Sequence, residues 1–522
     1  MERTNTGGPV TKAPRLRSPV LAWAAACLLA LASACGGRPE AEEGGLTVAL
    51  ESAPSTLDPR LATDAVSVHL SGLLFNGLTR LDQRAEPVPD LAVRWEVASE
   101  KEYRFTLRRG VRFHDGRELT AEDVAFTLRS VQDPALGSPL RGALEPVESV
   151  EVLDRYALRL RLSRPHAPLL AALAAGVVPR GTGAGTGPGD VPAGTGPFRL
   201  VRLVPRERVE LAAFPGHFAG PPRLPSLRFR VVPDATTRLL ELRKGTVDLL
   251  PGGLPPELLP AVRRLPHVRV LTGPSSNTTY LAFNLRDPIL GDRRVRTAVA
   301  SALDRESLVA DLMRGLAEPA TGLLPPRHWA YEGNVAQHPY DPARAKALLD
   351  AAGYPAGPDG VRFALTFKAT TGELSRALGE ILQEALRQVG IRVRIVSHEW
   401  GTFFADIRSG NFQVTALTWV GIADPDYLHY IFHSGSVPPH GANRGAYRNP
   451  EVDRLLEAAR TTAARERRRS LYGRVQAILA EDLPYVFLWH EVRWAAFRND
   501  LRDFRLLPSG DLTALREASL AR

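Results

Sequence analysis

Segments with the two-residue period of a strand recur along this chain, and segments with the apolar period of a helix lie between them. Alternation of apolar and polar side chains, typical of strands with one buried face, covers residues 103–107, 158–162, 227–231, 361–367 and 391–395. Helix starts are indicated where Thr120 precedes two acids and where Asp341 precedes Pro342. Further helical stripes cover residues 374–389, 452–459 and 471–479. This interleaving predicts an α/β protein.

Length and charge narrow the function classes. A chain of 522 residues exceeds one typical hydrophobic core, so two or more lobes are expected. The net charge of +9 comes from arginines interspersed with acids, and no basic patch is interleaved with aromatic residues, so nucleic acid is not an expected partner. The glycine-rich stretch at 181–196 lacks the spacing of a phosphate-binding loop and is predicted to be a mobile loop.

The amino terminus has the pattern of an export signal. Three basic residues precede an uncharged run over residues 20–34, which is shorter than the ~20 residues of a membrane-spanning helix. The run ends in small residues before Cys35 and resembles the lipobox of bacterial lipoproteins, in which the cysteine carries lipid. We therefore expect a lipoprotein signal peptide at 1–34, lipidation at Cys35 and a flexible tether at 35–45. A plain secretory signal with an incidental cysteine is the alternative.

Eleven segments of the chain form an ordered set, namely 55–59, 74–78, 89–92, 103–116, 119–124, 194–198, 280–284, 292–296, 302–305, 340–345 and 449–453. Taken together they resemble the peptide/nickel-type family, family 5, of extracytoplasmic solute-binding proteins that serve ABC importers. They follow the family order between about residues 46 and 498 and so cover nearly the whole chain after the signal.

The resemblance implies a two-lobe periplasmic-binding-protein-like fold of type II, in the large peptide-binding subclass, with mixed sheets and flanking helices. The first lobe would be discontinuous, formed by residues 46–279 and 491–522, and the second would span residues 280–490. The ligand would be enclosed between the lobes by hinge closure. A monomer without a cofactor or catalytic residue is expected, held at the membrane surface by lipid, with a membrane permease as its partner.

The segment 413–421 resembles the family's cleft strand, whose backbone pairs with an extended ligand. Trp419 would form an apolar wall of the site, although a tryptophan packed in the core is the alternative interpretation. The other expected ligand contacts are Leu417, Thr418, Gly421, Tyr280 and Ser55.

The acids after Trp419 depart from the family pattern. Members often have G-D-x-x-D-P there, and the first aspartate pairs with the ligand ammonium, but Ile422 stands at that position here. Either Asp424 or Asp426 performs this role, or the ligand lacks a free amine. Asp424 alternatively caps the helix expected to begin near Asp426.

The ligand class stays open at this point. A di- or oligopeptide is the leading expectation, and an oligosaccharide, an opine, or a nickel or haem chelate are alternatives. A secreted hydrolase is disfavoured because neither G-x-S-x-G nor H-E-x-x-H is present. A receptor that signals through a membrane partner is a further alternative. His429 and His433 have i, i+4 spacing, but two histidines are a weak signal alone, so no metal site is predicted.

Overall fold

The computed structural model describes residues 45–183 and 191–521. The expected signal peptide, Cys35, nearly all of the tether and much of the glycine-rich stretch lie outside the described residues. Within the described ranges, no helix has both the length and the apolar character needed to cross a membrane.

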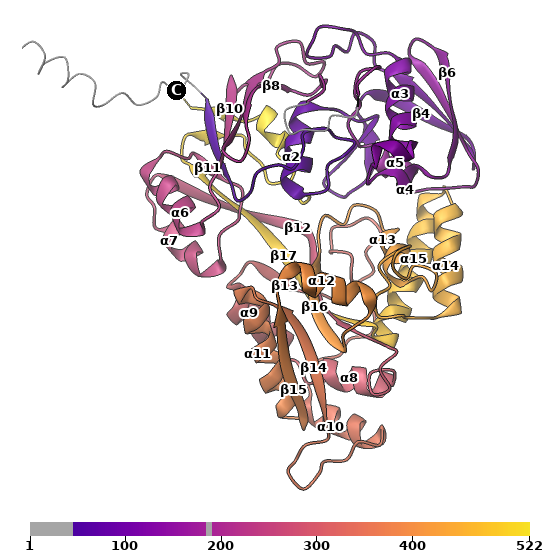
Figure 1. The fold of residues 1–522 in the computed structure, drawn as a ribbon, viewed down its shortest axis with the longest axis vertical. Helices are drawn as coiled ribbons and strands as arrows, with labels where there is room; N and C mark the ends of the chain where they lie inside the picture. Colours follow the sequence, from indigo (N-terminus) through magenta and orange to yellow (C-terminus); the bar gives the residue numbers. More distant parts are fainter. Residues whose placement is uncertain (1–44, 184–190, 522) are drawn as a thin grey trace, which may run out of the picture. The chain divides into compact units, whose positions relative to one another are not determined.

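The principal sheet is mixed and has eleven strands (Figure 1). Its order is β15-β14-β16-β12-β17-β11-β1-β10-β9-β8, with β13 paired to β17. The strands are β1 (Leu46–Leu50), β8 (Phe198–Val204), β9 (Arg208–Ala213), β10 (Ser226–Val231), β11 (Leu249–Leu250), β12 (Val268–Phe283), β13 (Ala317–Pro319), β14 (Phe363–Thr370), β15 (Ile391–His398), β16 (Val414–Trp419) and β17 (Tyr485–Arg498).

Two long antiparallel strands, β12 and β17, connect the two ends of this sheet. Their ladder pairs Val268 with Arg498 at one end and Ala282 with Tyr485 at the other. The register shifts between Pro274 and Thr278, so residues 275–277 lie outside the regular ladder. The break lies between the β11 side of the sheet and the β16 side.

A second, four-stranded sheet has the order β4-β5-β7-β6 and is antiparallel throughout. It consists of β4 (Ala92–Ser99), β5 (Glu102–Leu107), β6 (Val147–Asp154) and β7 (Ala157–Leu162). Two short hairpin-like pairs complete the strands, β2 (Thr79–Leu81) with β3 (Pro87–Pro89) and β18 (Leu501–Arg502) with β19 (Ser519–Leu520). The five segments with strand alternation are confirmed as parts of β5, β7, β10, β14 and β15.

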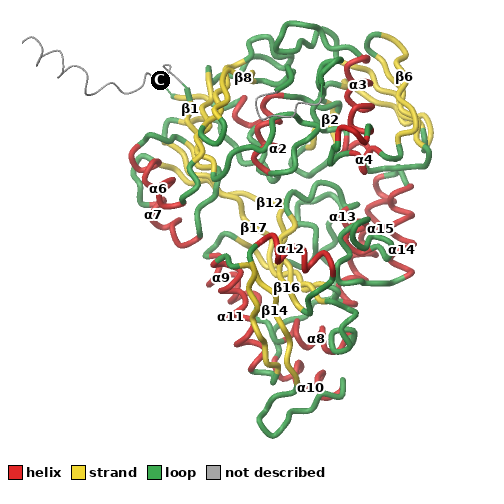
Figure 2. Tube along the Cα trace, viewed as in Figure 1, coloured by secondary structure: helices red, strands yellow, loops and turns green. Residues whose placement is uncertain are grey.

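Helices flank the strands, as α11 does where it packs on β14 and β15 (Figure 2). The capping signals are confirmed: Thr120 N–H donates to Asp123 Oδ2 at 2.8 Å, and Asp341 Oδ1 accepts from Arg344 N–H at 2.8 Å. The helices are α2 (Ala65–Leu74), α3 (Ala121–Gln132), α4 (Arg141–Leu144), α5 (Leu169–Ala172), α6 (Ala235–Lys244), α7 (Leu259–Arg263), α8 (Arg293–Ser301), α9 (Arg305–Met313), α10 (Pro342–Ala351), α11 (Glu373–Arg387), α12 (Trp400–Ser409), α13 (Tyr427–Phe432), α14 (Pro450–Thr461) and α15 (Arg465–Asp482).

The hydrophobic core consists of several clusters rather than one. Two clusters draw their buried residues from the range 280–489. Three others draw almost all of theirs from the ranges 46–268 and 494–518, with Leu316 as the exception. The mixed α/β class expected from the interleaved periods is confirmed by the mixed principal sheet and its flanking helices.

Candidate functional site

Strand β16 is paired along its whole length on one side only. Its partner there is β12, from Phe283 opposite Val414 to Thr278 opposite Trp419. On the other side β14 pairs with β16 at Val414 and Thr415 alone. Among the described residues, the outer edge of residues 416–419 therefore has no strand partner. A strand edge of this kind presents backbone N–H and C=O groups that an added strand can bind.

Aromatic rings surround Trp419 at the end of this edge. Its indole stacks on the ring of Tyr280, with centroids 5.9 Å apart, and meets Tyr427 and Tyr430 edge-on at 6.3 and 6.2 Å. Tyr280 is 1% exposed and stacks in turn on Tyr485, so it supports Trp419 from beneath. Trp419 itself is half-buried, which places it between the two interpretations, cleft wall and core residue, that the sequence left open.

Arg444 adds a positive charge to the aromatic cluster. Its guanidinium carbon lies 5.1 Å from the ring centroids of both Trp419 and Phe404, within the range of cation–π attraction. The nearest polar contact is long, 3.5 Å from Nη1 to the Tyr280 hydroxyl. No salt bridge joins Arg444 to an acid in the described parts of the chain. Sequence reasoning missed this residue, because no local motif links it to a tryptophan 25 positions earlier.

The two aspartates after Trp419 both face arginines. Asp424 Oδ1 lies 3.2 Å from Arg468 Nη2, and Asp426 Oδ1 lies 3.1 Å from Arg460 Nε. Burial raises the pKa of Asp426 to about 6, against the attraction of Arg460. Asp424 Oδ1 also accepts from the N–H of Asp426 at 2.8 Å, immediately before α13 begins at Tyr427. A contact of either aspartate with ligand stays a prediction.

The loop after Trp419 is held to the register break in β12. Gly421 has a φ of 67°, a left-handed conformation that favours glycine, and its N–H donates to Asn277 Oδ1 at 3.0 Å. Asn277 Nδ2 donates in turn to Glu491 Oε2 at 2.7 Å. Ile422 is fully buried, and its N–H donates to Ser276 C=O. One side chain, Asn277, thus contacts both the loop and strand β17.

The remaining predicted contacts lie in two different parts of the structure, on β16 and near the start of α2. Thr418 lies on β16, and its Oγ1 is 2.7 Å from Thr279 Oγ1 on β12, while Leu417 is half-buried beside it. Ser55 is exposed, and its hydroxyl donates to Asp64 Oδ2, which also accepts from Ser67 Oγ at the start of α2. No hydrogen bond in the described residues joins Ser55 to the Trp419 cluster, so its role stays a prediction.

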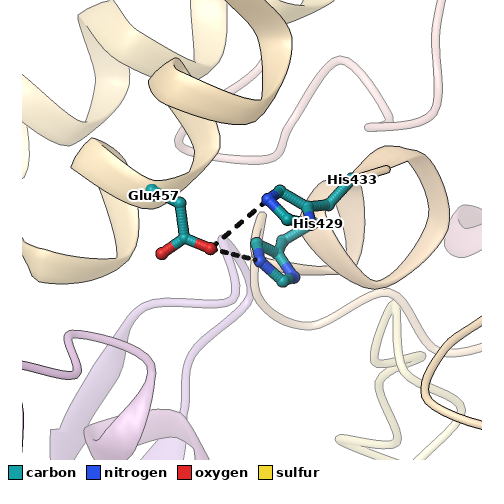
Figure 3. A group of neighbouring side chains, drawn as sticks. All are labelled: His429, His433 and Glu457. Carbon is teal, nitrogen blue, oxygen red and sulfur yellow. Dashed lines mark hydrogen bonds and ion pairs between the residues drawn. The ribbon is translucent and has the colours of Figure 1, made fainter. Parts of the chain in front are cut away.

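Two histidines and a glutamate form a separate polar cluster on α13 and α14 (Figure 3). His429 and His433 both direct Nε2 toward Glu457 Oε1, at 3.0 and 3.4 Å. One ligand atom from each of the three residues lies within 4.8 Å of the others. The i, i+4 spacing was visible in the sequence, but the glutamate was not connected to it there.

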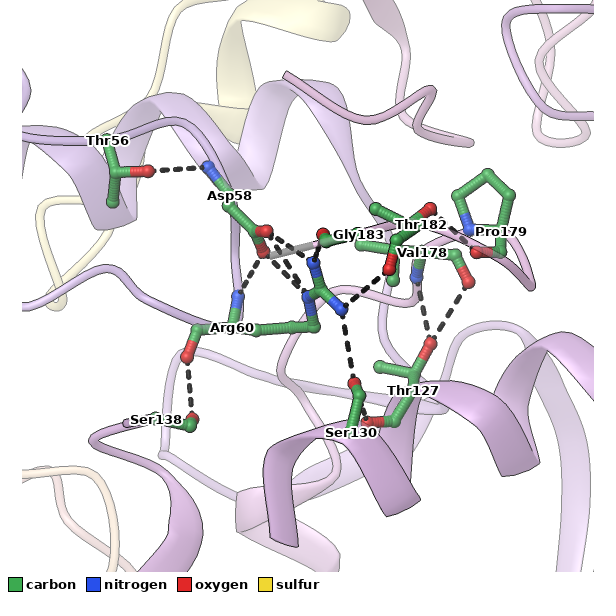
Figure 4. A network of polar contacts seen from close by, with 10 residues as sticks. All are labelled: Thr56, Asp58, Arg60, Thr127, Ser130, Ser138, Val178, Pro179, Thr182 and Gly183. Atoms are coloured by element: carbon green, nitrogen blue, oxygen red, sulfur yellow. Dashed lines mark hydrogen bonds and ion pairs between the residues drawn. The ribbon is translucent and has the colours of Figure 1, made fainter. Parts of the chain in front are cut away.

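The segment near Ser55 also contains a fully buried ion pair. Asp58 and Arg60 have side chains 2% and 1% exposed, with Arg60 Nη2 2.6 Å from Asp58 Oδ2 (Figure 4). Arg60 Nη2 also donates to Gly183 C=O at 2.8 Å, and Nη1 contacts Ser130 Oγ at 3.3 Å. These bonds satisfy the buried guanidinium, so the pair belongs to the framework of this region.

Comparisons with known proteins identify the family. The model of the family described as bacterial extracellular solute-binding proteins, family 5, matches residues 86–438. Di/tripeptide-binding protein 2 of Pseudomonas aeruginosa is 31% identical over 515 residues, with 92% of this chain and 96% of that protein covered. The dipeptide-binding protein of Escherichia coli is 28% identical, with 88% and 92% covered. The structure of NikZ from Campylobacter jejuni in complex with Ni(L-His) is 27% identical, with a TM-score of 0.79 and 91% and 99% covered.

Proposed function

The chain belongs to the family 5 bacterial extracellular solute-binding proteins, and from this premise we propose that it captures a di- or oligopeptide and delivers it to the permease of an ABC importer. Members of this family are binding proteins that act outside the cytoplasm. Relatives from two organisms are named as dipeptide- or di/tripeptide-binding proteins, which supports a peptide as the ligand.

The observation that carries this proposal is the open edge of β16 beside the Trp419 cluster. A peptide added as a strand would form main-chain hydrogen bonds with residues 416–419. Such bonds do not depend on the side chains of the peptide. Leu417, Thr418 and Gly421 would line this pairing. Trp419 would cover an apolar side chain of the ligand, supported by Tyr280.

Arg444 would bind the anionic end of the ligand. It is half-buried, and within the described residues it faces aromatic rings instead of an acid. A ligand carboxylate would complete a charge-assisted hydrogen bond there. Asp424 and Asp426 already pair with Arg468 and Arg460. A ligand ammonium would therefore bind carboxylates that also contact an arginine.

We infer two lobes joined at β12 and β17, one formed by residues 46–279 and 491–522 and the other by residues 280–490. The separate core clusters and the register break at residues 275–277 support this division. The contacts that would join one lobe to the other away from β12 and β17 include the ion pair of Glu86 with Arg465 and the hydrogen bond from Ala167 N–H to Arg460 C=O. Closure on ligand would be a hinge motion about the long strands.

We also infer that the protein is exported and held at the membrane surface through lipid on Cys35, as a monomer. The support is the sequence pattern before that cysteine and the membership of an extracellular family.

A ligand with a carboxylate and no ammonium group is the second candidate. The pairing of both loop aspartates with arginines favours it, because neither carboxylate is left over for an ammonium group.

Mass spectrometry of the ligand that copurifies with the native protein tests the function directly. A mixture of short peptides is the expected result. Calorimetry with a peptide and with its N-acetylated form separates the two candidates, since acetylation removes the ammonium charge. Loss of binding on acetylation supports the free peptide, and unchanged binding supports the ligand without ammonium. The absence of binding by any peptide would contradict the peptide proposal.

A further inference from the structure

The histidine pair on α13 meets a carboxylate that the ligand site does not use. His429 and His433 lie on α13 and at its end, and their rings stack with centroids 4.3 Å apart. Tyr427 and Tyr430, on the same short helix, contact Trp419 instead. Helix α14 supplies Glu457, whose side chain is 55% exposed and accessible to solvent (Figure 3). The cluster is therefore a separate feature with its own access.

We propose that His429, His433 and Glu457 form a binding site for a divalent transition-metal ion, with zinc favoured by the donor set, that ties α13 to α14. Two imidazoles and one carboxylate are the protein ligands of several zinc sites, and a fourth position is left for water.

The distances fit a single ion. Ligand atoms about 2.1 Å from a tetrahedral zinc lie about 3.4 Å from one another. Glu457 Oε1 lies 3.0 Å from His429 Nε2 and 3.4 Å from His433 Nε2. One ligand atom from each of the three residues lies within 4.8 Å of the other two, so rotation of the side chains can place a single ion between them.

The neighbouring polar groups orient these ligands. Ser436 Oγ lies 3.4 Å from His429 Nδ1 and can accept a hydrogen bond from Nδ1–H, which leaves the lone pair of the ring on Nε2. Gly435 N–H donates to His433 Nδ1 at 3.0 Å, so the ring proton of His433 is on Nε2. Coordination through Nε2 would require the proton to move to Nδ1, and the hydrogen bond from Gly435 would be lost. Asp453 Oδ1, 4.0 Å from His433 Nε2, is a second acid beside the site.

The local charge favours a cation despite one nearby arginine. Arg460 Nη1 lies 3.2 Å from His429 Nε2, but the same guanidinium pairs with Asp426. Among the described residues, neither Glu457 nor Asp453 forms a salt bridge with a lysine or an arginine.

Zinc titration of the chelator-stripped full-length protein by calorimetry tests the site without any peptide. One equivalent bound per chain is expected, weakened at least about tenfold in His433→Ala and in Glu457→Gln. His440→Ala removes an exposed histidine from the same segment and should bind zinc as the wild type does. Circular dichroism establishes that each variant is folded.

Thermal unfolding gives a second readout. Zinc should raise the Tm of the wild type and of His440→Ala by mass action, and should leave the Tm of Glu457→Gln unchanged. No saturable zinc binding by the wild type would overturn the proposal, as would zinc affinities of His433→Ala and Glu457→Gln equal to that of the wild type. Failure to bind peptides would affect the proposed function alone, since neither measurement contains a peptide.

Discussion

The guanidinium of Arg444 lies 5.1 Å above the ring centroid of Trp419, at the open edge of β16. The cation and the indole together offer a ligand an anion-binding group and an apolar surface in one place. The Trp419 ring attracts the guanidinium more weakly than a carboxylate would, so Arg444 can still bind an anionic group of the ligand.

Replacing Arg444 by glutamine should weaken ligand binding about 10- to 100-fold, which corresponds to losing one hydrogen bond to a charged group. Calorimetry with the copurified ligand class measures the change in Kd. Arg448→Gln, an exposed arginine four residues on, is the matched control and should leave the Kd unchanged. An equal change in Kd for Arg444→Gln and Arg448→Gln would show that Arg444 does not bind the ligand.

The buried pair of Asp58 and Arg60 should make a large contribution to stability. Replacing Arg60 by methionine leaves Asp58 buried without its partner and should lower the free energy of unfolding by about 3–5 kcal/mol, followed by circular dichroism in urea. Adding Asp58→Asn should recover part of the loss, because the unpaired charge is then gone. Arg387→Ala, in an exposed pair with Glu384, should change nothing measurable.

Stability should fall as the pH decreases from 6.5 toward 4, in part because of His490. Burial lowers the pKa of His490 to about 4 from its usual 6.5, and its Nδ1 lies 2.9 Å from Thr278 Oγ1. The unfolded chain therefore binds more protons in this window, and the stability present above pH 6.5 is lost as the pH falls to about 4. The limit is about 3 kcal/mol, at 1.36 kcal/mol per pKa unit.

His490→Gln should flatten this part of the stability curve when urea unfolding is repeated at several pH values. His440→Gln, at an exposed position, should leave the curve as it is. Other buried histidines with lowered pKa values, among them His217 and His328, should preserve the remaining slope. A stability curve of His490→Gln with the same slope as that of the wild type between pH 6.5 and 4 would contradict this role of His490.

Replacing Cys35 by serine should abolish incorporation of a labelled fatty acid in bacterial expression and move the protein from the membrane to the soluble fraction. The reason is that the thiol is the attachment point expected at the end of the apolar run. Cys27→Ser, inside that run, is the matched control and should keep the label. Membrane association that persists in Cys35→Ser would argue for a different anchor.

Local patterns made much of the fold predictable. Alternation identified β5, β7, β10, β14 and β15, because each has one buried face, and capping residues located the starts of α3 and α10. The family segments likewise led to β16 and Trp419. Strand β12 had no such alternation, because residues 275–283 are buried on both faces and the first five of them are polar.

The partners within the site could not be predicted in the same way. Arg444 reaches Trp419, and Glu457 reaches His429, only because α13, α14 and the segment between them fold back on one another. These contacts join residues about 25 positions apart that share no period. The arginine partners of Asp424 and Asp426 come from α14 and α15, so these ion pairs could not be predicted from the sequence either.

The bonds of Asn277 have a practical consequence. Its amide touches the backbone of Gly421 after the candidate ligand strand and the carboxylate of Glu491 on the strand that returns to the other end of the sheet. A motion that carries Gly421 away from β12 would break the first of these bonds and leave the second in place. The NMR signal of the Asn277 side-chain amide would therefore report in the intact protein, without a fluorophore, whether the loop is attached to β12.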